Sequence, residues 1–221
     1  MRIKITKSGP YLVTGGVPLR EKIITPVGRG YRLAEGRELP QAKSYALCRC
    51  GRSSTAPFCD GAHMNSGFAG KETASRALYE ERAQRQEGIS LDLLDDGRCA
   101  YVRFCHTHKG DVWTLAETAD TAELRDLAVK AAGECLAGRL VAVQKDGKIL
   151  EPELSPEINI LQDPEKEISG GIYVMGGIAV ESAEGYEYER RNRLVLCRCG
   201  RSQNKPYCDG MHAAGNGFVD R

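Results

Sequence analysis

The sequence predicts an α+β chain with two small β-rich modules, one toward each end, joined through a small α+β middle domain. Residues 47–63 and 196–212 are near copies that share 12 of 17 positions without a gap. A β-like segment with a paired glycine precedes each copy, and a Gly-Phe pair follows it. An apolar stripe over residues 120–137 predicts one amphipathic helix between them. The repeated unit is therefore a whole module, strands first and cysteine loop second.

Turn-forming and polar residues set the predicted domain boundaries. Gly9-Pro10 and Gly15-Gly16 divide the first module into short strands. Within the middle domain, Asp120 is placed to cap the amphipathic helix and Gly138 to end it. Three prolines among acidic residues indicate a linker before the second module. The resulting units are a first module at 1–70, a helical linker at 71–88, a middle domain at 89–150, a linker at 151–168 and a second module at 169–221.

Composition and charge exclude several classes of protein. The 221 residues are 41% hydrophobic and 28% charged, with 31 basic and 30 acidic side chains and a net charge of +1. A near-neutral chain has no electrostatic reason to bind nucleic acid or an anionic membrane. The sequence lacks the long apolar run of a membrane-spanning helix and the apolar core of a signal peptide. We therefore expect a cytoplasmic protein without nucleic-acid or membrane partners.

The nine cysteines fall into three groups of three. Thiols in a reducing compartment are more often metal ligands or reactive groups than disulfides. Each near-copy has the pattern Cys-x-Cys, eight residues, Cys, three residues, His, which supplies four donors. Four such donors are a complete set for one tetrahedral metal ion or for a two-iron cluster. The two sets are Cys48, Cys50, Cys59 and His63, and Cys197, Cys199, Cys208 and His212.

The spacing of the four donors predicts which of them lie on the same side of the loop. In an extended loop, the two cysteines of Cys-x-Cys point to the same side. A helix starting near Asp60, with Asp60 as its cap, would place Cys59 and His63 about one turn apart on one face. Structural zinc is a plausible occupant on ligand type. However, zinc knuckles usually separate the first two cysteines by two to four residues, whereas here one residue separates them.

The two loops resemble the CDGSH iron-sulfur domain of mitoNEET-type proteins. The matching residues are C-R-C-G-R-S, then Pro, an aromatic residue and C-D-G-x-H, where x is Ala62 in one copy and Met211 in the other. The resemblance implies a [2Fe-2S] cluster in each loop, with one iron held by the Cys-x-Cys pair. The second, more exposed iron would be held by Cys59 and His63 in the first copy and by Cys208 and His212 in the second.

The same resemblance implies how the modules are arranged. Single-copy members of the family are intertwined homodimers with two clusters. Because this chain supplies both copies, we expect the modules to pair about a pseudo-two-fold axis within one monomer.

Three further cysteines lie in the middle domain, at Cys99, Cys105 and Cys135. Their surroundings resemble a divergent single-cluster ferredoxin domain, although Val102 fills the second cysteine position and Leu136 replaces the usual proline. The resemblance implies a third cluster, of the [3Fe-4S] or [4Fe-4S] type. The alternative is a fold that keeps its cysteines as small buried apolar residues.

These observations favour an iron-sulfur protein for electron transfer or for cluster storage and transfer. Its partner would be a redox protein or a cluster acceptor, and we expect no enzyme activity. The alternative is a zinc-binding structural or adaptor module that uses the same donors. Four arginines flank the cysteines, namely Arg49, Arg52, Arg198 and Arg201. They are either solvated charges, or groups that offset the negative charge of a reduced cluster or dock an acidic redox partner.

Overall fold

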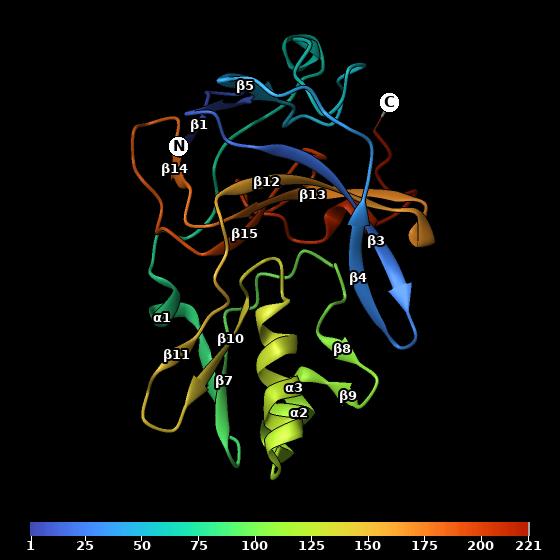
Figure 1. Cartoon of the computed structure of the whole chain (residues 1–221). Helices are drawn as coiled ribbons and strands as arrows, with labels where there is room; N and C mark the ends of the chain where they lie inside the picture. Colours follow the sequence, from blue (N-terminus) through green and yellow to red (C-terminus); the bar gives the residue numbers. More distant parts are fainter. Residues whose placement is uncertain (221) are drawn as a thin grey trace.

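The two ends of the chain build two sheets with matching strand orders (Figure 1). The computed structural model describes residues 1–220. The first sheet has the order β14 (Ala179–Glu181), β1 (Arg2–Ile5), β2 (Tyr11–Thr14) and β5 (Ser44–Leu47). The second has the order β3, β12, β13 and β15, with β4 added outside β3. Their bounds are β3 (Leu19–Val27), β4 (Gly30–Glu35), β12 (Glu157–Asp163), β13 (Ile168–Met175) and β15 (Arg193–Leu196).

The modules exchange one strand each. Strand β14 of the second module pairs in parallel with β1, placing Val180 opposite Ile3. Strand β3 of the first module pairs in parallel with β12, placing Glu21 opposite Ile160. Strand β5 corresponds to β15, β2 to β13, β1 to β12 and β14 to β3. This reciprocal exchange confirms the expected pseudo-two-fold pairing of the modules within one chain.

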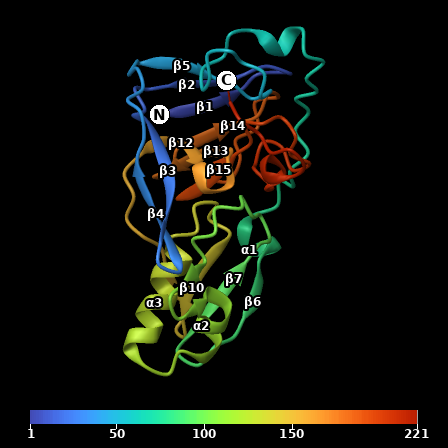
Figure 2. The same cartoon turned by 90° about the vertical axis from the view of Figure 1, so that its right-hand side faces the viewer.

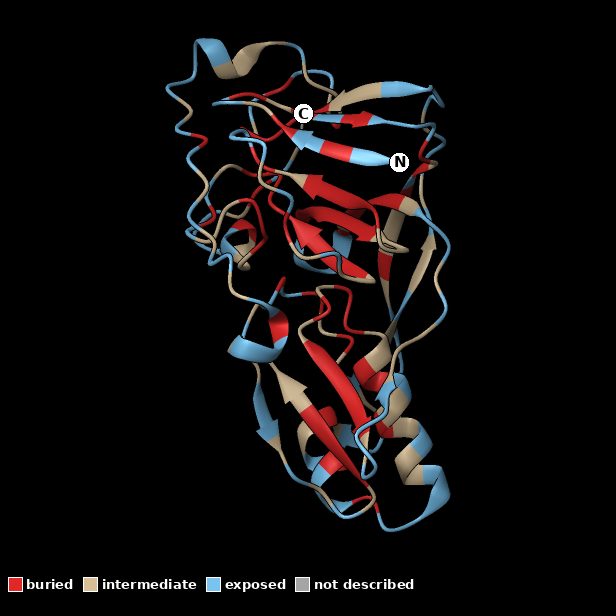
Figure 3. Cartoon of the chain, turned by 90° about the vertical axis from the view of Figure 1, so that its left-hand side faces the viewer, coloured by how far each residue is buried: buried red, intermediate tan, exposed pale blue. Residues whose placement is uncertain are grey.

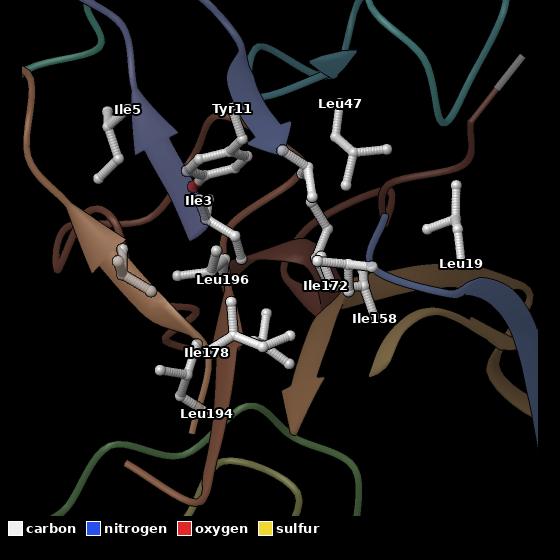
Figure 4. Close-up of a cluster of buried hydrophobic side chains, with 14 of the residues drawn as sticks. Ile3, Ile5, Tyr11, Leu19, Leu47, Ile158, Ile172, Ile178, Leu194 and Leu196 are labelled. Carbon is white, nitrogen blue, oxygen red and sulfur yellow. The ribbon is translucent and has the colours of Figure 1, made fainter. Parts of the chain in front are cut away.

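One apolar core joins the two sheets (Figure 4). Exposed and buried residues alternate strictly along β1 and β2, so each strand contributes every second residue to this core. Ile3 and Leu47 come from the first module, and Ile158, Ile172 and Leu196 come from the second. Because both modules fill the same interior, neither can bury its apolar face alone.

The middle segment forms a separate layer below the second sheet (Figure 2). Its sheet has the order β11–β10–β7–β6, and helices α2 and α3 pack against this sheet. A two-stranded ribbon, β8–β9, precedes the helices. The bounds are β6 (Gln84–Gln86), β7 (Leu91–Asp95), β8 (His106–Thr107), β9 (Gly110–Asp111), α2 (Val112–Thr118), α3 (Ala122–Gly133), β10 (Leu140–Gln144) and β11 (Ile149–Leu150).

The predicted helix of residues 120–137 forms as α3, with shorter bounds. Thr121, not Asp120, is the N-cap, and its side chain accepts a hydrogen bond from the Leu124 amide. The helix ends at Gly133, so Gly138 lies beyond it, in a left-handed turn against Arg193. Thr121 has the extended backbone of an N-cap residue, and its hydroxyl can accept from the first-turn amides.

Two predicted linkers contain strands. The 151–168 segment holds β12, a central strand of the second sheet, followed by the 3₁₀ turn η2 (Pro164–Lys166). Prolines and acidic residues near Ile158 and Ile160 obscured the alternating apolar pattern that predicts a strand. The 71–88 segment is mostly irregular and holds only the short helix α1 (Tyr79–Arg82) and β6.

Figure 3 shows the buried positions concentrated in the strands of the second sheet and of the middle segment's sheet. No helix within residues 1–220 has the length and apolarity needed to cross a membrane.

Candidate metal centres

Each cysteine loop begins where a strand of its module ends. Strand β5 leads into Cys48 and β15 leads into Cys197. The loop then folds back, because the Cys48 amide donates to the Pro57 carbonyl and the Cys197 amide donates to the Pro206 carbonyl, both at 2.8 Å. The returning chain therefore brings the third cysteine and the histidine beside the Cys-x-Cys pair.

The four donors of each loop are arranged as two pairs. In the first loop, the Sγ atoms of Cys48 and Cys50 are 3.6 Å apart, and Cys59 Sγ lies 3.4 Å from His63 Nδ1. The second loop repeats this arrangement, with 3.8 Å between the two thiols of Cys-x-Cys and 3.4 Å between Cys208 Sγ and His212 Nδ1. Within residues 1–220, no three histidine, cysteine or acidic side chains converge on one ion position.

The expected helix around the third cysteine is a short 3₁₀ turn. It spans Ala62–Met64 in the first loop (η1) and Met211–Ala213 in the second (η3), and a left-handed glycine precedes each. Asp60 accepts from the Ala62 amide at 3.0 Å, and Asp209 accepts from the Met211 amide at 3.1 Å. The aspartates thus stabilise the turn as expected, although the cysteine lies before it rather than within it.

The chemistry of the donors fits a cationic metal group. Burial raises the pKa of the Cys50 thiol to about 11, although the Arg52 amide favours its thiolate. Burial also raises the pKa of Cys208. Thiols in such surroundings stay protonated unless a metal ion compensates the thiolate charge. Burial, together with Arg198, lowers the pKa of His212 to about 4, so its imidazole is neutral and able to ligate at neutral pH.

Two of the flanking arginines are structural, contrary to the solvated or partner-docking roles expected from sequence. Arg49 and Arg198 are only 2% and 1% exposed. The Arg49 guanidinium donates to three backbone carbonyls, and Arg198 donates to two carbonyls and to the Asp220 carboxylate. Arg49 also stacks on Phe68, and Arg198 on Phe218. The repeated Gly-Phe tail therefore covers an arginine that holds the loop in place, whereas Arg52 and Arg201 are exposed.

The two loops touch across the pseudo-two-fold axis. A Cβ atom on Gly51 would lie 2.6 Å from the Cys199 carbonyl oxygen, and one on Gly200 would lie 2.8 Å from the Cys50 carbonyl oxygen. Both glycines have positive φ, 70° and 76°. Each loop therefore needs glycine for its own turn and for its contact with the other loop. Tyr11, which the sequence did not single out, adds a buried hydroxyl that contacts the second loop.

The two sites differ in exposure. Cys59 and His63 are half-buried, whereas Cys208 and His212 are 4% and 3% exposed. The middle segment causes this difference: a Cβ on Gly210 would lie 3.5 Å from the Tyr101 Cβ, whereas the matching glycine of the first loop meets only Met64. The first site therefore faces solvent and the second is covered.

The three middle cysteines lie near one another without forming a single-ion site within residues 1–220. Cys135 is buried in the apolar core of the middle segment, Cys105 packs partly against that core, and Cys99 is exposed. Burial, together with the neighbouring Cys135 and Cys99, raises the pKa of Cys105 to about 11. Burial also raises the pKa of Cys135. Cys135 therefore packs as a small apolar residue does, whereas the exposed Cys99 does not.

The fold and its two Cys₃His loops define a class of protein in which two strand-exchanged β-modules each present one metal-binding loop. Residues 8–64 and 169–213 match the family model described as "Iron-binding zinc finger CDGSH type". These two regions of the chain are therefore CDGSH domains, which are of an iron-binding type. Comparison with curated proteins gave no match, and comparison with solved structures gave none either.

Proposed function

We propose that this protein carries one [2Fe-2S] cluster at each site and serves electron transfer or the storage and transfer of clusters. Cys48, Cys50, Cys59 and His63 would hold one cluster, and Cys197, Cys199, Cys208 and His212 the other. When bound, such a cluster supplies reversible one-electron chemistry. The observation that carries the proposal is the division of the donors into two pairs at each site.

The pair distances favour two metals per site over one. For metal–sulfur bonds of about 2.3 Å, two thiolates on one tetrahedral metal lie about 3.8 Å apart. Both Cys-x-Cys pairs have this separation, at 3.6 and 3.8 Å. A single zinc ion would require the four donors to converge on one position, and within residues 1–220 no three histidine, cysteine or acidic side chains do so. The zinc module is therefore the weaker alternative.

The difference in exposure between the two sites indicates that they have different roles. The half-buried His63 and Cys59 give the first site a face that an acceptor or redox partner can reach. The second site has no comparable face because the middle segment lies on it. We therefore infer that exchange with a partner protein takes place at the first site. The proposal includes no substrate turnover, so the protein would be a carrier and not an enzyme.

The test is metal and sulfide analysis of protein purified without oxygen. Two [2Fe-2S] clusters correspond to about four iron atoms and about four acid-labile sulfides per chain. The matched variants Cys50→Ser and Cys199→Ser should each lose about half of both. One zinc ion per site without sulfide would refute the proposal. Iron near seven or eight per chain would instead assign a third cluster to Cys99, Cys105 and Cys135.

A second experiment separates the two roles. The loaded protein is mixed with an apo-ferredoxin in the absence of reductant. Appearance of the ferredoxin spectrum, with loss of iron from the first site, would favour cluster transfer. A reversible redox couple without any transfer would favour electron carriage.

A further inference from the structure

A large cavity separates the second sheet from the middle segment. It has a volume of about 1020 Å³ and lies between the outer face of β12 and β13, the β3–β4 hairpin and α3. Figure 1 shows where these elements lie in the fold. Its lining is mainly apolar and includes Leu33, Phe104, Leu127, Leu154 and Met175. Cavities of roughly 300–1000 Å³ with apolar walls are typical of sites for small organic ligands.

Two polar groups without protein partners lie side by side in this wall. Asn159 on β12 is directly opposite Tyr173 on β13. Asn159 is 1% exposed; its Oδ1 has no hydrogen-bond partner, and its Nδ2 reaches only the Met175 sulfur at 3.4 Å. The Tyr173 hydroxyl likewise has no partner within residues 1–220, and burial raises its pKa to about 12, so it remains a donor. Native proteins rarely leave buried polar atoms unpaired, because each costs about 1–3 kcal/mol.

The cavity lining holds three basic and three acidic side chains, and one of the basic side chains has no ion pair within residues 1–220. Lys22 and Lys130 line the cavity, but each is paired with a glutamate, Glu35 and Glu134. Arg32 on β4 also lines it, is exposed, and makes no ion pair within residues 1–220. One free guanidinium therefore stands beside an apolar interior, an arrangement that suits an anionic group on an otherwise apolar molecule.

Aromatic side chains on two different elements line the same space. Tyr31 from β4 and Phe104 from the middle segment have ring centroids 6.1 Å apart. Phe104 and Tyr173 also belong to the apolar cluster that contains Cys208. The cavity thus lies against the covered metal site, and flat aromatic molecules match its ring-lined wall.

We propose that this cavity binds an aromatic anion that carries an N–H or O–H donor. The donor pairs with Asn159 Oδ1 and the Tyr173 hydroxyl donates to an acceptor on the same ring system. The rings lie among Phe104 and its apolar neighbours, and the anionic group lies beside Arg32. Each unpartnered group of the cavity then has a partner. This binding is independent of the metal content of either site.

The probe is 4-oxo-1H-quinoline-2-carboxylate, which has fused rings, one N–H, one ring carbonyl as acceptor and one carboxylate. Isothermal titration calorimetry on the full chain, as purified, should detect one saturable site. Asn159→Leu should weaken binding about 5- to 10-fold through loss of one hydrogen bond. The free energy of unfolding of that variant should stay equal or rise, because an unpaired buried amide is replaced by an apolar group of similar shape. A purely structural asparagine would show the opposite change in stability.

Arg32→Gln is the second variant. Because Arg32 is exposed, its replacement should leave the stability of the fold unchanged. It should weaken binding several-fold. The controls are Lys148→Gln, which removes another exposed unpaired cation, and Ile89→Ser, which removes an exposed apolar side chain outside the cavity. Both controls should bind as the unchanged protein does. Absence of saturable binding, or equal losses in the controls and the cavity variants, would overturn the proposal.

Discussion

The Tyr11 hydroxyl of the first module donates to the Cys197 carbonyl of the second module at 2.9 Å. It also reaches the Pro206 carbonyl at 3.2 Å, and the side chain is fully buried. One side chain thus connects the strand of one module to both ends of the other module's metal loop. The corresponding position of the second module is Ile172, so this connection exists in one direction only.

Tyr11→Phe should destabilise the protein through this contact. It leaves the buried Cys197 carbonyl without its donor, at a cost of about 1–3 kcal/mol, whereas the Pro206 carbonyl still accepts from the Cys197 amide. Chemical denaturation followed by circular dichroism measures the change. Tyr45→Phe is the matched control, because its half-buried hydroxyl donates to Val17 within the first module. Both variants should lose stability, but only Tyr11→Phe should also speed the loss of metal from the second site.

Gly51→Ala should disrupt the contact between the two loops. The added Cβ meets the Cys199 carbonyl at 2.6 Å, in addition to the cost of about 1–2 kcal/mol for a left-handed alanine. Gly185→Ala is the control, since Gly185 also has positive φ but nothing within 4 Å of an added Cβ. We expect Gly51→Ala to lower the midpoint of thermal unfolding clearly more than the control. Equal midpoints would show that the loops do not pack as the structure has them.

The two sites should lose iron at different rates. A chelator reaches the half-buried Cys59 and His63 more easily than the covered Cys208 and His212. Iron release followed by visible absorbance should therefore have a fast and a slow phase of similar amplitude. Cys50→Ser should remove the fast phase and Cys199→Ser the slow phase. A single phase in the unchanged protein would contradict the assignment of the first site to exchange.

Stability of the middle segment should fall in acid through Asp95. Burial alone would raise the pKa of Asp95, but Arg139, the Gly97 amide and the Trp113 indole outweigh it and hold the pKa below its ordinary value. A carboxyl with a lowered pKa stabilises the fold above its unfolded pKa of about 3.9 and loses that effect as pH falls through the folded value. Trp113 is the only tryptophan, so its fluorescence reports this step.

Asp95→Asn provides the comparison for that titration. It should lose stability at neutral pH, because Arg139 loses its charged partner. Its stability should then depend less on pH below about 4 than that of the unchanged protein. An identical pH dependence in both proteins would place the titrating group elsewhere.

The sequence alone predicted both Cys₃His donor sets and determined the repeat of the module. The donors lie within 17 residues of one another, so local spacing is sufficient to group them. The α3 helix followed from its apolar stripe in the same way. By contrast, β12 was hidden among prolines and acidic residues, since its place at the centre of a sheet depends on strands far away in the chain.

Only the tertiary structure decided which surfaces meet. The motifs are nearly identical in sequence, yet one His ligand candidate is half-buried and the other is covered by the middle segment. Arg49 and Arg198 likewise looked like surface charges until the loops closed over them. Burial depends on long-range packing of segments that local patterns cannot pair, so the difference between the two sites is a property of the fold and not of the motif.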